Sequence, residues 1–153
     1  MQNIEIKRTG FPIQIGGIDF FFSTAEDNIA RFLEMVNDPE SYAKKVDELA
    51  DEATLIEVKD GEIPDVEQYR KMIELQKRAL EIIYDVMLGE GGFKLLYAIY
   101  PDVRALINIM NAVIETISTG LEEWRKAETK KAQKQIGETI IAKKKKTAKK
   151  AKK

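Results

Sequence analysis

Residues 89–124 read GEGGFKLLYAIYPDVRALINIMNAVIETISTGLEEW, and this stretch decides the fold class. Glycines at its start predict a helix stop, because glycine readily adopts the left-handed backbone found just past helix ends. A short aromatic helix over residues 93–100 follows, and Pro101 and Asp102 open a long amphipathic helix. Gly120 either breaks that helix or lies within it, and the pattern leaves both open. The apolar side chains on one face of the long helix are Val103, Leu106, Ile107, Met110, Val113, Ile114 and Ile117.

Upstream of Gly89, hydrophobic spacing predicts three more helices. The first follows a capping box, formed by Ser23 with Glu26 or by Thr24 with Asp27. The second, which Asp38 and Pro39 can open, has an a/d heptad seam of Tyr42, Val46, Leu49, Ala53 and Ile56. The third spans residues 65–88, with a stripe of Val66, Tyr69, Ile73, Leu80, Ile83 and Met87.

The N-terminal residues predict a small antiparallel sheet. Residues 11–15 and 18–22 alternate in polarity and are separated by Gly16 and Gly17, which favours a tight hairpin turn because both central residues need positive φ. Ile4 and Ile6 also alternate with charged residues, as in a half-buried strand. We therefore expect two or three strands.

The predicted fold is mainly α with a small N-terminal antiparallel β-hairpin (α+β), about four to five helices and a disordered basic C-terminal tail. Residues 1–126 form the folded, α-rich domain. Residues 127–153 form a helical extension that frays into a Lys-rich tail, with disorder expected after about residue 140 because a dense run of like charges repels itself and buries nothing.

Composition excludes several classes of enzyme. The chain has no Cys and no His, which removes disulfides, thiolate metal sites and the commonest general base. Asp60, Glu62, Asp65 and Glu67 lack the order of a calcium loop and are better explained as a turn and a helix start. We expect no catalytic residue, no cofactor and no metal. Without a secretory signal or a membrane-spanning run, the sequence predicts a soluble cytoplasmic protein.

Charge divides the chain in two. Residues 1–124 carry 12 Lys and Arg against 24 Asp and Glu, a net charge of −12, whereas residues 125–153 carry 13 against 2, a net charge of +11. The basic tail could bind nucleic acid, act as a solubilising tail or pair with the acidic domain. No aromatic residue is interleaved with its lysines, which disfavours stacking on single strands. The residues of this tail are Lys143, Lys144, Lys145, Lys146, Lys149 and Lys150.

The aromatic residues are the candidate partner-binding side chains. Either they pack the sheet onto the helices, or some of them face another molecule. Three consecutive phenylalanines at positions 20–22 must point to both faces of a strand, so one face of the small sheet needs a cover. The candidates are Phe20, Phe22, Phe93, Tyr97, Tyr100 and Trp124.

Two segments together resemble a known family. The opening IEIKRTGFPIQIGGIDFFFSTAEDNIARF and the later LGEGGFKLLYAIYPDVRALINIMNAVIETISTGLEE resemble the small tail assembly chaperones of long-tailed, non-contractile bacteriophages and of prophages in Gram-positive bacteria. The resemblance covers roughly residues 4–124 and rests on the order of the segments more than on any invariant motif.

The resemblance implies a non-enzymatic role in the host cytoplasm. Such chaperones bind the long, largely helical tape-measure protein, help to recruit subunits of the major tail protein, and leave before the tail is finished. Many have a frameshifted long form, and the lysine run at 143–146 is a candidate slippery site. The chain could also form a homo-oligomer. Two rivals remain open: a basic-tailed nucleic-acid-binding or regulatory protein, and an acidic inhibitor that mimics nucleic acid.

Overall fold

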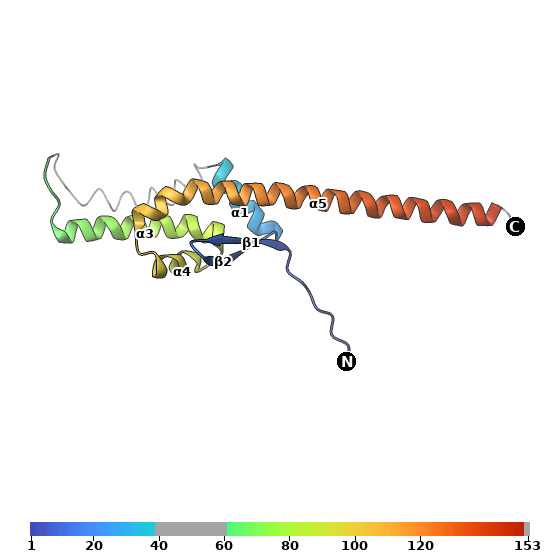
Figure 1. Ribbon diagram of the computed structural model, residues 1–153, viewed down its shortest axis with the longest axis horizontal. Helices are drawn as coiled ribbons and strands as arrows, with labels where there is room; N and C mark the ends of the chain where they lie inside the picture. Colours follow the sequence, from blue (N-terminus) through green and yellow to red (C-terminus); the bar gives the residue numbers. More distant parts are fainter. Residues whose placement is uncertain (39–60, 152–153) are drawn as a thin grey trace. The chain divides into compact units, whose positions relative to one another are not determined.

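The computed structural model describes residues 1–38 and 61–151, with side chains described as far as residue 145. Within these ranges the chain is mainly helical with one antiparallel hairpin, which confirms the predicted fold class (Figure 1). The predicted heptad seam at 42–56 lies outside the described residues. The elements are β1 (Gly10–Ile15), β2 (Ile18–Ser23), α1 (Glu26–Asn37), α3 (Val66–Leu88), α4 (Gly92–Ile99) and α5 (Val103–Ala151).

The hairpin forms as its glycines predict. Gly16 and Gly17 have φ of 57° and 81°, and Ile15 pairs with Ile18 across the turn. Side chains alternate between the two faces, so Ile13 and Phe20 are buried, whereas Phe21 is 47% exposed on the opposite face. The sheet therefore buries one face against the helices and leaves its outer face open.

Of the two or three strands expected, the described sheet has two, and Ile4 and Ile6 are not part of it. Residues 1–9 lie outside both strands, and Ile4 and Ile6 are 86% and 93% exposed. The physical reason is the position of the segment along the hairpin. The backbone N–H of Thr24 still bonds the carbonyl oxygen of Thr9, but the chain then turns into α1 and offers no further partner.

Helix α1 packs its buried residues under the hairpin. Phe22 of β2 and Phe32 of α1 are each 1% exposed and meet edge to face, with ring centroids 5.6 Å apart. The capping box predicted at Ser23 or Thr24 does not form. The helix begins after Ala25, and Ser23 instead accepts a hydrogen bond from the backbone of Ala25 through its hydroxyl.

Helix α3 is the central element of the core and packs against α1, α4 and β2. It begins with a capping box between Asp65 and Gln68, so the acidic residue predicted to open this helix does so. The predicted apolar stripe is only partly buried. Leu80 and Met87 are buried, whereas Val66 and Tyr69 in the first turns are 68% and 56% exposed.

Tyr84 is the fully buried side chain of α3 that the stripe did not include. Its hydroxyl donates a hydrogen bond to the carbonyl oxygen of Leu106 in α5. Burial raises the pKa of Tyr84 from 10.0 to about 12, because the ionised phenolate would lose its hydration. This bond fixes the first turns of α5 against α3.

The glycine turn and α4 follow the prediction. Gly91 caps α4 in the left-handed conformation, at φ 82°, and the backbone N–H of Phe93 bonds the Asp85 carboxylate at 3.0 Å. The next helix opens at Asp102, which accepts a hydrogen bond from the backbone of Ala105. The predicted face of α5 is confirmed: Val103, Leu106, Val113 and Ile117 are buried, and Ile107, Met110 and Ile114 are half-buried.

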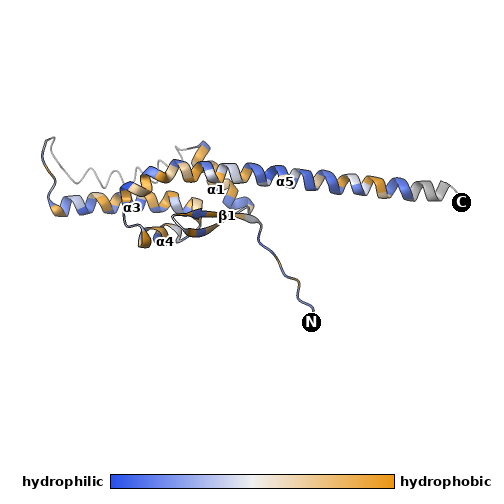
Figure 2. Cartoon of the chain, viewed as in Figure 1, coloured by the Kyte–Doolittle hydropathy of each residue, from blue (hydrophilic) through white to orange (hydrophobic). Residues whose placement is uncertain are grey.

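The chain divides into two compact units, Met1–Ile117 and Ser118–Lys153. Gly120 lies within α5, so the helix does not end there. Helix α5 continues to Ala151, past residue 140 where disorder was expected to begin. The difference has a local reason, since Lys and Ala both have high helix propensity even where nothing is buried. Figure 2 shows this second part of α5 as largely hydrophilic, with a few apolar residues.

Candidate partner-binding surface

The six aromatic candidates divide between the core and the surface. Phe20, Phe22 and Phe93 are 8%, 1% and 3% exposed, so they pack the core and are not available to a partner. This is the packing alternative of the sequence analysis, and it corrects their place among the partner-binding candidates. Tyr97 and Trp124 are half-buried, and Tyr100 is 42% exposed.

Tyr97 lies in a cleft between α3 and α4. Its ring stacks on that of Phe93, with centroids 5.6 Å apart and planes inclined by 23°. The ammonium of Lys77 lies 4.3 Å from the centre of the Tyr97 ring, within the range of a cation–π contact. The cleft has a volume of about 380 Å³, and the ion pair of Lys94 with Glu81, at 3.9 Å, lies at its rim.

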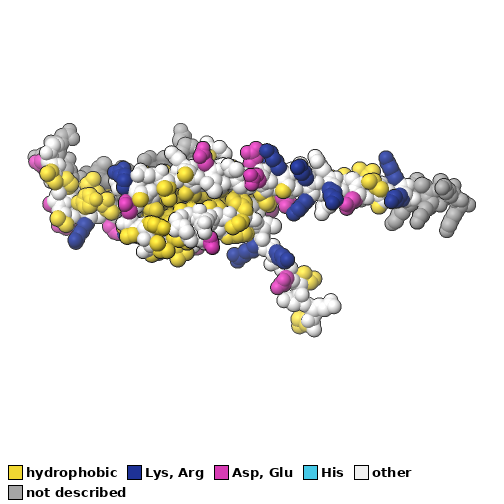
Figure 3. All heavy atoms as spheres, viewed as in Figure 1, with side chains coloured by type: hydrophobic (Ala, Val, Ile, Leu, Met, Phe, Trp, Pro, Cys, Tyr) yellow, Lys and Arg dark blue, Asp and Glu magenta, His cyan; other side chains and the backbone are white. Residues whose placement is uncertain are grey.

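An apolar stripe on α4 lies outside the core. Leu95 and Ile99 are 61% and 60% exposed and stand four residues apart, so they lie on the same side of the helix. Tyr100, just past the end of α4, extends this surface, which we call the α4 stripe: Leu95, Ile99 and Tyr100. Figure 3 shows hydrophobic side chains gathered over α4 and the hairpin.

Leu95 and Ile99 were not predicted from the sequence as exposed candidates, although a signal was present. Helix α4 has apolar residues on most of its circumference, and a helix of eight residues buries only one side. Phe93 and Leu96 lie on the buried side. The remaining apolar residues must therefore face solvent or a partner. Choosing the candidates by aromatic character favoured the buried side of α4 over its exposed side.

A groove lies between the hairpin and the first part of α5. Its volume is about 390 Å³, and its walls are mostly apolar. Tyr100 stands at this groove, and its hydroxyl donates a hydrogen bond of 2.5 Å to the carbonyl oxygen of Gly16. The residues that line the groove are Ile13, Gln14, Ile15, Gly16, Leu96, Tyr100, Ala105, Leu106, Ile109, Ala112, Val113 and Thr116.

The second unit presents charge and a few apolar side chains. Lys143, Lys144 and Lys145 are exposed, whereas Lys146, Lys149 and Lys150 lie beyond the described side chains. In the same unit Ile136, Ile140 and Ile141 are 60%, 48% and 55% exposed. Thr129 and Thr139 turn their hydroxyls back to the helix backbone, where they donate hydrogen bonds to carbonyl oxygens.

In residues 1–38 and 61–145, no three or more Asp and Glu side chains gather as they would around a metal ion. No helix in the described part of the chain has the length and apolar character needed to cross a membrane. The described residues do offer surfaces for binding: the α4 stripe, the cleft at Tyr97 and the groove beside β1.

Comparison with models of protein families, with curated proteins and with solved structures finds no match for this chain.

Proposed function

We propose that this chain is a non-enzymatic tail assembly chaperone that binds a tape-measure protein in the host cytoplasm and helps to recruit tail-tube subunits around it. The proposal joins the resemblance at residues 4–124 to one observation, the exposure of Leu95 and Ile99 on α4. Two large aliphatic side chains four residues apart present a ridge to which the apolar face of an amphipathic helix can pack. A tape-measure protein, which the resemblance implies to be long and helical, offers many such faces.

The surroundings of the α4 stripe suit a partner that must be released. The cleft on the Tyr97 side of α4 has charged residues, Lys77, Lys94 and Glu81, beside an aromatic floor. An apolar centre with a polar border is typical of protein interfaces that form and dissociate. The net charge of −12 on residues 1–124 would also keep an assembly with an apolar partner soluble.

The test is co-purification with a tape-measure protein, the long helical partner that the resemblance implies. The double variant Leu95→Asp/Ile99→Asp should retain at least about tenfold less partner, which corresponds to about 1.4 kcal/mol or more of lost binding free energy. Both side chains are mostly exposed, so the far-ultraviolet circular dichroism should be unchanged. The matched control is Ile63→Asp, because Ile63 is 94% exposed and lies outside every described helix and strand.

Equal retention by the double variant and the Ile63→Asp control would remove the α4 stripe from the proposal. Absence of any complex with the wild-type chain would remove the proposed function itself. The gene provides a separate test of the long form: an overlapping reading frame at the codons of residues 143–146 supports frameshifting, and a clean stop without overlap removes it.

The basic residues 125–153 favour one alternative function, attachment to nucleic acid. Its described lysines at 143–145 are exposed, and residues 125–153 carry a net charge of +11. If this were the main function, retention on DNA should fall steeply with salt and vanish when residues 143–153 are deleted. Binding to the tape-measure protein that survives the same deletion would instead favour the chaperone.

A further inference from the structure

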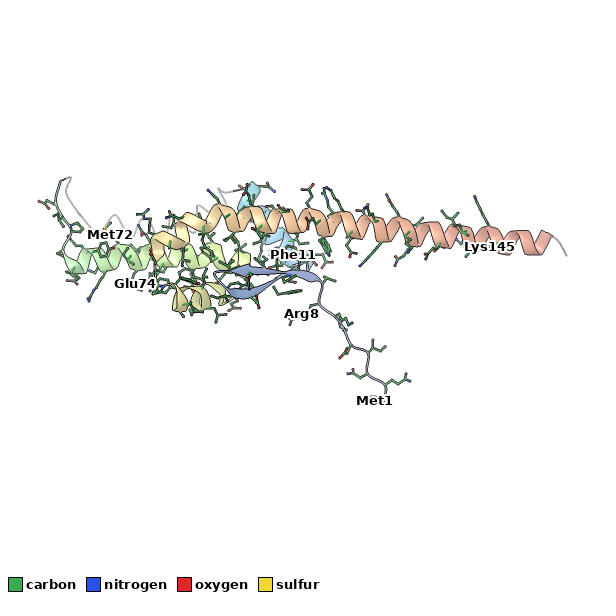
Figure 4. All side chains as sticks on the ribbon, in the orientation of Figure 1. Met1, Arg8, Phe11, Met72, Glu74 and Lys145 are labelled. Carbon is green, nitrogen blue, oxygen red and sulfur yellow. The ribbon has the colours of Figure 1, made fainter. Side chains whose placement is uncertain are left out.

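The N-terminal segment has the pattern of a strand but no strand partner in the described part of the chain. Ile4 and Ile6 alternate with Glu5 and Lys7, and both isoleucines are more than four-fifths exposed. Burying an isoleucine side chain is worth about 1.5–3 kcal/mol, so this exposure leaves a large favourable term unused. Figure 4 shows the segment from Met1 to Arg8 extending away from the hairpin.

The hairpin has an edge that can receive such a strand. The register pairs Ile15 with Ile18 across the two-residue turn, so alternate residues of β1, counted back from Ile15, exchange backbone hydrogen bonds with β2. The hydrogen bond from Thr24 N–H to Thr9 continues that series. Gly10, Pro12 and Gln14 therefore direct their backbone groups away from β2: three carbonyl oxygens, and the N–H donors of Gly10 and Gln14, because proline has none. Within the described sheet of two strands, nothing pairs with that edge.

The apolar groove lies beside this same edge. One wall is β1 itself, from Ile13 to Gly16, and the other is the face of α5 that includes Ala105, Ile109 and Ala112. A strand that pairs with β1 sends every second side chain toward the helix side of the sheet. The small residues Ala105 and Ala112 leave space there. The groove thus takes an extended segment with apolar residues at alternate positions.

The chain's own N-terminus is poorly placed to fill its own groove. Thr9 and Gly10 already pair with Thr24 and Ser23, so a reversal onto the outer edge of β1 would have to use residues 7 and 8. At most residues 1–6 would then remain to pair, with Ile6 at the turn rather than along β1. A second copy has no such restriction on reach.

We propose that residues 3–8 of one copy add as a strand to β1 of a second copy, with Ile4 and Ile6 in the groove and Glu5 and Lys7 on the outer face. The charge of the segment is opposite in sign to that of the unit that would receive it. The segment carries Lys7 and Arg8 against Glu5, a net charge of +1, whereas residues 10–117 carry 10 Lys and Arg against 21 Asp and Glu, a net charge of −11.

The contact joins the N-terminal segment of one copy to the groove of another, so the two surfaces in contact are different. The geometry of the contact therefore decides whether the assembly is closed or open. Two copies that exchange segments form a closed dimer, and copies that each donate to the next form a chain. The inference does not depend on the proposed function, because that proposal rests on Leu95 and Ile99, which do not line the groove. Tyr100 is the residue of the α4 stripe that does.

Cysteine cross-linking between separate copies tests the contact, and the absence of native cysteine makes every thiol an introduced one. The full-length variants Ile6→Cys and Ile109→Cys are purified separately, mixed and oxidised. The expected result is a disulfide-linked heterodimer, identified by mass spectrometry of the linked peptides. The control pairs Ile63→Cys with Ile109→Cys, because Ile63 is 94% exposed and Ile6 is 93% exposed.

A yield of the heterodimer no greater than that of the Ile63 control overturns the proposal. So does a double variant, Ile6→Cys/Ile109→Cys, that links only within one chain. A second measurement uses sedimentation: the wild-type chain should contain dimers or larger species that Ile4→Asp/Ile6→Asp loses at unchanged circular dichroism. A wild-type chain that stays monomeric at every concentration also overturns it.

Discussion

The hydroxyl of Tyr100, just past the end of α4, donates its hydrogen bond to the carbonyl oxygen of Gly16, which lies 84 residues earlier in the hairpin turn. The same ring packs so closely on the turn that a Cβ atom at Gly16 would lie 2.6 Å from its Cε2 atom. Two segments distant in sequence therefore hold each other at the mouth of the groove. The neighbouring Gly17 has no atom within 4 Å of its Cβ position.

Because the Tyr100 ring lies close to Gly16 and nothing lies close to Gly17, alanine should lower the free energy of unfolding by different amounts at the two positions. Both have positive φ, so Gly17→Ala should lower the free energy of unfolding by about 1–2 kcal/mol through backbone strain alone. Gly16→Ala should lower it by about 1–3 kcal/mol more, because the methyl group must displace the Tyr100 ring. Urea denaturation followed by circular dichroism measures both.

Removing the Tyr100 ring separates the steric clash at Gly16 from the backbone strain that both alanine variants share. In a Tyr100→Ala background the two glycine variants should become similar, and the difference is the coupling energy of a double-mutant cycle. Equal losses for Gly16→Ala and Gly17→Ala in the wild-type background would show that the ring does not lie on the turn in solution.

Features set by short sequence signals could be predicted. Gly16 and Gly17 indicated the hairpin, Asp65 the start of α3, and Gly91 the turn before α4, because each depends on backbone conformation or a local hydrogen bond. Helical spacing likewise predicted the buried face of α5. Signals of this kind need no knowledge of the rest of the chain.

Features decided by long-range packing could not be predicted. Alternation separates Phe21 from Phe20 and Phe22, but only the position of the helices decides which face of the sheet is covered. Ile4 and Ile6 have a strand pattern, yet β2 ends before it could pair with them. The same limit explains the candidate site, where the aromatic Phe93 proved to be core and the aliphatic Leu95 is exposed.

The buried hydroxyl of Tyr84 predicts a stability change at high pH. Its pKa is raised from 10.0 to about 12 by burial, so the folded state holds the proton more tightly than the unfolded state. The stabilisation is complete below pH 10 and is lost as the pH rises from about 10 toward about 12. The free energy of unfolding should fall by about 3 kcal/mol over that range from this residue.

The matched variant is Tyr84→Phe, which keeps the ring and removes the ionisable group. At neutral pH it should be less stable than the wild-type chain by about 1 kcal/mol, because the hydrogen bond to Leu106 is lost. Above pH 10 the difference should narrow and then reverse. Parallel pH profiles for the two proteins would contradict the burial of this hydroxyl, and tyrosinate absorbance gives an independent titration.

The capping box at the start of α3 predicts a local effect of Asp65. The Asp65 carboxylate accepts the backbone N–H of Gln68 at 2.8 Å, so Asp65→Ala should lower the free energy of unfolding by about 1 kcal/mol. The control is Lys71→Ala, whose ion pair with Glu67 spans 3.8 Å between largely exposed side chains and should contribute less than about 0.5 kcal/mol. Equal effects in thermal denaturation would show that the cap does not hold the helix.

Gly137 in the second unit predicts a gain of helix on substitution. It lies within α5, and no atom lies within 4 Å of its Cβ position, so Gly137→Ala adds helix propensity of about 1 kcal/mol without a clash. The reverse change at an exposed position of the same helix, Ala132→Gly, should remove a similar amount. Far-ultraviolet circular dichroism and amide hydrogen exchange over residues 126–145 should move in opposite directions for the two variants. If neither variant changes them, this segment is not helical in solution, and the disorder that its charge density predicted would extend toward Trp124.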